Sequence, residues 1–207
     1  MAKSRHFHFQ SHDSSLIFQE WKDAFNAETY LDDQFTIPKH TVAYFGDGAS
    51  WYRSLSSPFY LDDILHFGRL GQSKNHHKLK GFKVLIHASD TIYHDQWALD
   101  YLKKKAIRNF NQDVFGDYQF RISQGGILFQ QLTSIGFDIA DVPYLAFITK
   151  LNDYLQHDFV RLASSATYQG QAVDLLKLEF AKVVQQRFEK WGLQMVDFQT
   201  NIVPSTR

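Results

Sequence analysis

The sequence predicts an α+β fold: a small mixed sheet flanked by helices, followed by a C-terminal antiparallel helical pair. Two observations predict it. Short apolar or alternating segments, typical of strands, occupy much of the first two thirds of the chain, whereas the last third carries apolar residues at steps of three and four. We expect a single domain over residues 1–207, with a sheet-containing part at 1–135 and a helical part at 136–207.

The expected sheet runs from residue 40 to about residue 132. Its strands are predicted from apolar runs and from alternation of polar and apolar residues. A further short strand is expected near the N-terminus, where residues 5–9 alternate. The predicted strands of the sheet are 40–45, 82–87, 118–122 and 127–132.

The expected helices follow apolar residues at helical spacing. Ile17, Trp21 and Phe25 predict a helix over 15–28, and a second helix is expected over 92–111. In the last third, Asp141 and Pro143 are typical of a helix start, and Gly192 is placed to end a last helix that begins near residue 171. These last two helices are expected to pair. Residues 61–67 are predicted as either a strand or a short helix.

Charge and cysteine content exclude several classes of protein. Lys plus Arg total 22 and Asp plus Glu total 22, so bulk attraction to polyanions or anionic membranes is excluded, although local basic patches are not. The chain has no cysteine, which excludes disulfides, thiolate metal sites and cysteine nucleophiles. The sequence shows neither a signal peptide nor a membrane-spanning run, and we therefore expect a soluble, cytoplasmic protein.

The most informative segment runs from His40 to His66. An apolar run ends in Gly46-Asp47-Gly48, and Asp63-Ile64-Leu65-His66 follows sixteen residues after Asp47. Carboxylates that converge from neighbouring strand ends can hold divalent metal ions for phosphodiester chemistry. We therefore predict Asp47, Asp63 and His66 as catalytic residues. Asp47 and Asp63 would bind Mg²⁺ or Mn²⁺, and His66 would act as a ligand or proton carrier. The alternative is that the glycines and Asp47 form an ordinary tight turn.

The same segment resembles a fragment of one group of insertion-sequence transposases that have a ribonuclease-H-like catalytic core. That group carries a Gly-Asp-Gly-Ala-x-Trp string, matched here by residues 46–51, followed by an Asp-x-Phe-His string in which Leu65 replaces Phe. The resemblance covers about 27 of the 207 residues. It implies an earlier aspartate on the first strand and a later glutamate on a helix. By position, the candidates are Asp13, Asp23, Asp32, Asp33 and Glu179.

Two pairs of histidines suggest alternative sites. His6 and His8 alternate on a predicted strand, so both side chains point to one side and suit one metal ion. This pair, with Tyr101 and a lysine three residues later, is similar to rolling-circle nucleases.

The second pair is His40 and His87. Each lies on a predicted strand, and His87 is followed two residues later by Ser89, as in 2H phosphoesterases. In that family one histidine is the general base and the other the general acid. His40 has Val42 at the position of the hydroxyl residue, which departs from the motif. For both pairs the alternative is that the histidines are structural.

A cluster of cations is predicted on one helix face, formed by Lys103, Lys104, Lys105 and Arg108. It would bind nucleic acid through the phosphates, or it is simply a solvated face. Two functions therefore stay open. One is metal-dependent phosphodiester or nucleic-acid chemistry. The other is a non-catalytic interaction module from a phage, plasmid or defence locus, which would bind a protein partner or a second copy through exposed aromatic residues near Trp51, Tyr52, Phe59 and Tyr60.

Overall fold

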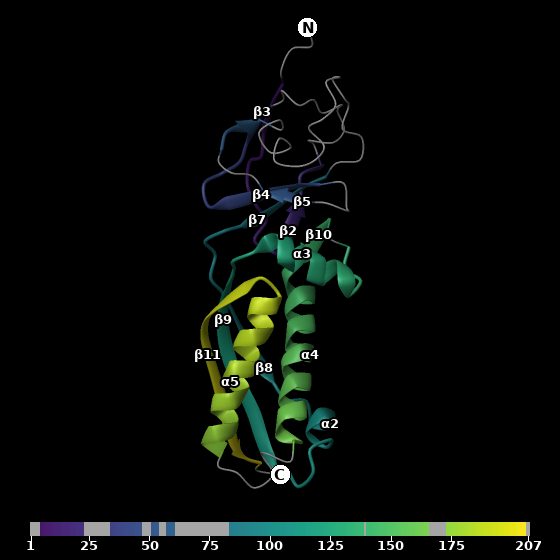
Figure 1. Cartoon of the computed structure of the whole chain (residues 1–207), viewed down its shortest axis with the longest axis vertical. Coiled ribbons are helices and arrows are strands. Elements are labelled where there is room, and N and C mark those ends of the chain that lie inside the picture. The colour runs from purple at the N-terminus through teal and green to yellow at the C-terminus, as the bar shows by residue number, and fades with distance from the viewer. Residues whose placement is uncertain are drawn as a thin grey trace. The chain divides into compact units, whose positions relative to one another are not determined.

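The computed structural model describes residues 5–22, 34–46, 51–53, 57–60, 83–138, 140–165 and 173–205. These residues form a mixed α+β structure with three small sheets and four helices (Figure 1). The chain divides into two compact units. Unit 1 comprises Met1–Asp90 and Leu128–Tyr144, and unit 2 comprises Thr91–Ile127 and Leu145–Arg207. Within the described residues no helix combines the length and apolar character that crossing a membrane requires.

Unit 1 contains two sheets. The larger has the strand order β10-β2-β7-β4-β5, and the smaller has the order β1-β3-β6, in which β1 and β3 are parallel. The strands are β1 (His6–His8), β2 (Leu16–Glu20), β3 (Gln34–Thr36), β4 (Thr41–Gly46), β5 (Trp51–Arg53), β6 (Phe59–Tyr60), β7 (Lys83–Ala88) and β10 (Asp141–Pro143).

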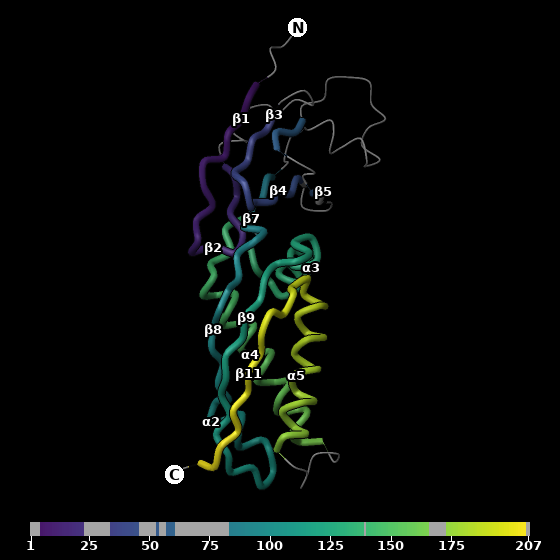
Figure 2. The backbone as a smooth tube through the Cα atoms, turned by 90° about the vertical axis from the view of Figure 1, so that its left-hand side faces the viewer, coloured from purple at the N-terminus to yellow at the C-terminus, as the bar shows by residue number. Residues whose placement is uncertain are grey.

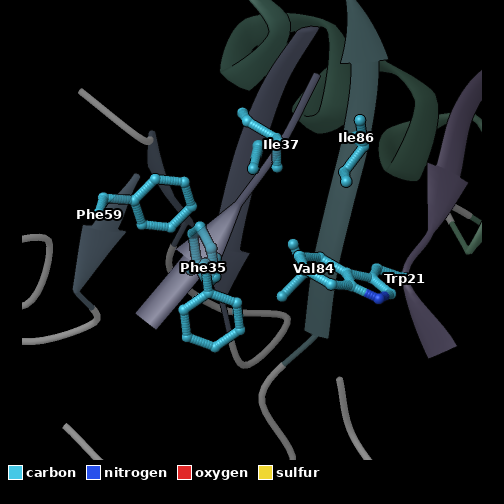
Figure 3. Packing of buried hydrophobic residues seen from close by; sticks show 8 residues of the cluster. Trp21, Phe35, Ile37, Phe59, Val84 and Ile86 are labelled. Atoms are coloured by element: carbon cyan, nitrogen blue, oxygen red, sulfur yellow. The ribbon is translucent and has the colours of Figure 1, made fainter. Parts of the chain in front are cut away.

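Both faces of the larger sheet are buried at β4 and β7. Ala43, Phe45, Val84 and Ile86 lie on one face and pack against aromatic residues of the smaller sheet, among them Phe35 (Figure 3). This arrangement explains why β4 and β7 are continuous apolar runs in the sequence. The predicted strands at 40–45 and 82–87 are confirmed within one residue at each end.

The opposite face of this sheet is closed by helix α3 (Gly125–Ser134). Phe129 of α3 contacts Phe18 of β2, with ring centroids 4.0 Å apart, and Tyr44 of β4 at 4.9 Å. His87 of β7 lies on the same face, between the rings of Phe18 and Tyr44. The imidazole of His87 is therefore enclosed by the rings of phenylalanine and tyrosine residues.

Unit 2 is a three-stranded antiparallel sheet covered by two long helices. The strand order is β11-β9-β8. Its elements are β8 (Tyr93–Ala98), α2 (Tyr101–Lys104), β9 (Gln112–Ile122), α4 (Tyr144–Ala163), α5 (Val173–Lys190) and β11 (Leu193–Pro204). Figure 2 shows α5 standing to one side of this sheet.

The helices of unit 2 pack on the sheet face that carries Trp97, Tyr118 and Phe120. The ring of Phe120 contacts Phe147 of α4 at 6.0 Å and Phe188 of α5 at 5.9 Å. Tyr154 of α4 contacts Trp191, which directly follows α5, whereas Phe159, later in α4, contacts Phe180, earlier in α5. The helices α4 and α5 are therefore antiparallel (Figure 1).

A buried ion pair links the same two helices. Asp158 of α4 is 4% exposed and accepts hydrogen bonds from Nε and Nη2 of Arg187 on α5, each at 2.8 Å. A bidentate arginine–carboxylate pair fixes both distance and orientation. It therefore sets the register in which α4 and α5 pack.

The helix predicted over 15–28 is wrong in its first part. Residues 16–20 form β2, which lies between β10 and β7, so that Ile17 and Phe18 are both fully buried. A short apolar run followed four residues later by Trp21 fits a helix and a buried strand equally well. Residues 16–20 form a strand because they make hydrogen bonds to both β10 and β7.

Two further predictions are wrong for related reasons. The helix expected over 92–111 begins instead with strand β8, in which Tyr93 and Trp97 point inward, and only Tyr101–Lys104 is helical. The strand expected over 127–132 is helix α3, whose Leu128, Phe129 and Leu132 are buried at helical spacing. Residues 93–98 form a strand because they pair with β9. Residues 125–134 form a helix whose apolar side packs on the sheet of unit 1.

The last third contains strands that the sequence analysis misses. Asp141 and Pro143 belong to β10 rather than to a helix start, and β11 follows α5. Gly192 ends α5 as predicted. Its φ of +70° suits glycine, and an added Cβ would lie 2.3 Å from the carbonyl oxygen of Gln124. This tight turn leads directly into β11.

Candidate ligand-binding site

The predicted catalytic residues Asp47, Asp63 and His66 lie outside the described residues. The strand expected ahead of Asp47 is confirmed, because β4 ends at Gly46. The predicted binding of Mg²⁺ or Mn²⁺ by Asp47 and Asp63 therefore stays a prediction.

The other carboxylates that the transposase resemblance implies divide into two groups. Asp23, Asp32 and Asp33 also lie outside the described residues. Asp13 accepts hydrogen bonds from the backbone and hydroxyl of Ser15, and these bonds lower its pKa. Glu179 pairs with Lys182 on the surface of α5. Asp13 and Glu179 thus have local partners of their own.

His6 and His8 point to the same side of β1, as predicted, with ring centroids 4.1 Å apart. Nε2 of His6 lies 2.9 Å from Oγ1 of Thr36. The histidines belong to unit 1, whereas Tyr101 and Lys104 belong to unit 2.

His40 and His87 have different surroundings. Nδ1 of His40 bonds the carboxylate of Asp90 at the surface, whereas His87 is buried under α3. A matched acid–base pair of the 2H kind needs both rings to face one substrate, and the contacts of these two rings differ completely.

The four predicted cations do not share one helix face, because α2 is only four residues long. Two of the lysines turn back toward carboxylates. Lys103 bonds Asp153 of α4, and Nζ of Lys104 lies 2.8 Å from Oδ1 of Asp113 on β9. Lys105 instead lies over the ring of Tyr101, at 4.5 Å from its centroid. The positive charges of Lys103 and Lys104 are therefore paired with carboxylates, whereas that of Lys105 lies over an aromatic ring.

Arg108 is exposed, and no described carboxylate pairs with it. Among the four predicted cations, Lys105 and Arg108 thus keep their charge available to a ligand, whereas Lys103 and Lys104 serve the fold. An exposed cation near an aromatic ring is well placed to meet a phosphate beside a stacked base.

Lys104 takes part in a three-residue polar cluster. Its Nζ donates to Oγ of Ser205 as well as to Asp113, and Oγ of Ser205 donates to Oδ1 of Asp113 at 2.7 Å. The cluster connects the last residue of α2 to β9 and to the residue that follows β11. The carboxylate of Asp113 is the shared acceptor of the cluster, because it accepts from both Lys104 and Ser205.

A hollow of about 1110 Å³ opens beside this cluster. We name it the α2 hollow. It is lined by Leu99, Tyr101, Lys104, Lys105, Ile107, Asn109, Phe110, Asn111, Asp113 and Ser205. The volume is slightly above the usual range of small-molecule sites, which is about 300–1000 Å³. Apolar, aromatic, amide and charged groups line it.

The geometry of the hollow favours binding rather than catalysis. Tyr101 is 64% exposed, and Lys105 covers its ring. Asn109 adopts the left-handed conformation, with φ of 58°, which is tolerated by asparagine and helps to turn the chain at the rim. The amides of Asn109 and Asn111 can both donate and accept hydrogen bonds.

Sequence reasoning identified the lysines of the α2 hollow but not its other polar residues. Asn109 and Asn111 lie in a connector with no motif, and Ser205 follows β11, about one hundred residues later in the chain. Only the pairing of β11 with β9 brings Ser205 to Lys104. Asn109 falls inside the helix predicted over 92–111, although asparagine is a residue that favours turns.

Among the described residues, no group of three or more His, Asp or Glu side chains is placed to hold a metal ion. Comparison with protein-family models and with curated proteins gives no match.

Proposed function

We propose that the protein binds single-stranded nucleic acid through the α2 hollow. The observation that carries the proposal is the exposed Tyr101 ring with Lys105 over it, at the edge of a hollow that also presents two amides. Aromatic rings stack on bases of any sequence, and neighbouring cations bind the phosphates. Asparagine amides can pair with base edges.

The charge pattern predicts the strength and the salt dependence of binding. Lys105 lines the hollow, and Arg108 lies between the lining residues Ile107 and Asn109 in the chain. Neither pairs with a described carboxylate, so about two phosphates would be neutralised. For single strands, two such contacts give a slope of about −1.4 in a plot of log K against log salt. The overall charge of zero adds no long-range attraction. We therefore expect weak, local binding.

The test is fluorescence anisotropy with labelled oligo(dT) and oligo(A) strands, at several salt concentrations. Tyr101→Ala and the double variant Lys105→Gln/Arg108→Gln should each weaken binding at least tenfold, and the double variant should also flatten the salt slope. Lys190→Gln, an exposed lysine at the end of α5, is the matched control and should bind as the wild type does. No binding by the wild type, or equal affinity in all variants, would refute the proposal.

We propose separately that Asp47, Asp63 and His66 of unit 1 carry out a metal-dependent phosphodiester reaction on nucleic acid. Its support is the sequence pattern and the position of Asp47 directly after β4. Incubation of an oligonucleotide with Mg²⁺ or Mn²⁺ tests it, with Asp47→Asn as the inactive variant. Intact oligonucleotide after incubation with the wild type would leave a binding protein without this activity.

An interaction module is the second candidate, and apolar residues at the surface of α5 favour it. Leu175 and Leu178 are 48% and 55% exposed and lie three residues apart, on one face of the helix. The aromatic segment predicted to be exposed supports it less, because Phe59 is buried and only Tyr60 is partly exposed. The side chains of Trp51 and Tyr52 lie outside the described part.

Sedimentation of the wild type and of Leu175→Ser/Leu178→Ser at several concentrations distinguishes the candidates. A second copy bound on this face would give a concentration-dependent dimer that the double variant loses. A monomer at every concentration would argue against self-association through α5, and the nucleic-acid proposal would stand independently of that result.

A further inference from the structure

Amide and carboxylate side chains gather on the outward face of the sheet of unit 2. In β9, buried residues alternate with residues that lie on the side of the sheet away from α4 and α5. The strand pairing places these outward residues in rows across the three strands. One row is formed by Ala98, Phe115 and Asn201, and the next by Gln96, Asp117 and Gln199. We name this six-residue surface the amide face.

The amide face is open to solvent in the part of the chain that the structure describes. Phe115 is 45% exposed, and the other five residues are exposed too, except for the half-buried Asp117. The helices pack on the other face of the sheet, where α4 contacts Phe120 and α5 contacts Trp97 (Figure 2). No described helix or strand therefore covers the amide face.

Strand propensity does not explain the residues of the amide face. Strands favour β-branched and aromatic residues, whereas asparagine and aspartate are depleted in them. Surfaces that serve solubility are rich in lysine and glutamate, and the amide face has neither. Residues that go against a local preference without a gain in packing are expected where a ligand binds.

The charges of the amide face disfavour an anionic ligand. Asp117 is negatively charged, and Asp197 lies in the next row of the sheet. Arg121, further along the chain, is the one cation among the outward residues of β9. Phosphates would therefore be repelled. A largely apolar protein partner fits as poorly, because Phe115 and Ala98 are the only apolar residues of the six. These properties favour a ligand that is neutral and polar.

We propose that the amide face binds a neutral oligosaccharide, with one sugar ring lying on Phe115. Sugar hydroxyls both donate and accept hydrogen bonds, as the amides of Gln96, Gln199 and Asn201 do, and the carboxylate of Asp117 accepts them. The C–H side of a sugar ring is apolar and gains from burial against an aromatic ring. Neighbouring strands are about 4.8 Å apart, so the side chains of one row can reach hydroxyls of the same ring.

The spacing along β9 suits a linear chain of sugars. Phe115, Asp117 and Gln119 follow one another on the outward side, at intervals of about 6.6 Å. One sugar ring would lie on Phe115, and the following rings would lie over Asp117 and Gln119. Ala98 is too small to cover the phenyl ring from the neighbouring strand. None of the six residues lines the α2 hollow, so either site can be absent without the other.

The experiment is two-dimensional proton–nitrogen NMR of the full chain, titrated with cellotetraose, maltotetraose or chitotetraose. At least one of these sugars should bind with a millimolar Kd and shift the side-chain amide signals of Gln96, Gln199 and Asn201. Phe115→Ala and Gln199→Ala should each weaken binding at least fivefold. Phe115→Trp keeps an aromatic ring and should bind at least as tightly as the wild type. The matched control is Gln186→Ala, an exposed glutamine on α5, which should leave the affinity unchanged.

Three results would overturn the proposal. The first is the absence of any shift at about 10 mM of each of the three sugars, which excludes a millimolar Kd. The second is equal affinity in the wild type, Phe115→Ala and Gln199→Ala. The third is displacement of the bound sugar by oligo(dT), which would assign this face to nucleic acid instead. Unchanged signals from the core of unit 2 in each variant check that a loss of binding is not a loss of structure.

Discussion

Replacing His87 by glutamine should remove a large part of the acid sensitivity of unit 1. The side chain of His87 is 2% exposed, and burial lowers its pKa from 6.5 to about 4. The charged groups that act on it are His12 and Arg53, and both lower its pKa further. In the unfolded chain the ring is solvated and regains its ordinary pKa. Glutamine has a similar size and does not titrate.

The sign and the size of the effect follow from the two pKa values. Between pH 6.5 and pH 4 the unfolded chain binds a proton at this ring and the folded chain does not, so stability falls as the pH falls. Each pKa unit corresponds to about 1.4 kcal/mol, which gives a loss of about 3 kcal/mol over the whole window. Above pH 6.5 the contribution is fully present. Below pH 4 both states are protonated and no more is lost.

The assay is urea unfolding of metal-free protein at pH 7.0 and pH 4.5, followed by hydrogen exchange of peptides that cover β4 and β7. The wild type should lose about 2.4 kcal/mol more between these values than His87→Gln does, because pH 4.5 is still above the folded pKa. Loss of stability through other groups is common to both proteins and cancels in the comparison. His94→Gln, an exposed histidine on β8, is the control and should behave as the wild type. Equal acid losses in the wild type and in His87→Gln would refute the reasoning.

Two further substitutions test the packing of unit 2 by urea unfolding at neutral pH. Asp158→Asn leaves Arg187 half-enclosed without its carboxylate and should cost about 3 kcal/mol, whereas Glu189→Gln on the exposed side of α5 should cost less than 0.5 kcal/mol. Gly116→Ala places a methyl group 1.9 Å from the carbonyl oxygen of Gln199 and should cost about 3 kcal/mol, because backbone of β11 must move. A loss below 1 kcal/mol in either variant would contradict the contact described.

The sequence predicted the elements whose surroundings make their pattern unambiguous. The strands β4 and β7 are mostly apolar because both of their faces are covered, and α4 and α5 each bury one stripe of residues. The strand β8 could not be recognised in this way. Its inward positions include the half-buried Asp95 between Tyr93 and Trp97, so the alternation that identifies a strand is interrupted.

The site was predicted less completely than the fold, because its residues are brought together over long distances in the chain. The lysines after Tyr101 were recognised as a cluster, but the carboxylate that binds Lys103 comes fifty residues later. No local pattern reveals such a partner.

The discontinuity of unit 1 along the chain has a consequence for its synthesis. When the ribosome has made the first ninety residues, the sheet of unit 1 still lacks the edge strand β10, and the aromatic side that holds His87 still lacks Phe129. Both come only with residues 128–144. The apolar face of the unit 1 sheet therefore stays uncovered while the first strands of unit 2 are translated. A fragment that ends at Asp90 would expose the same face to water.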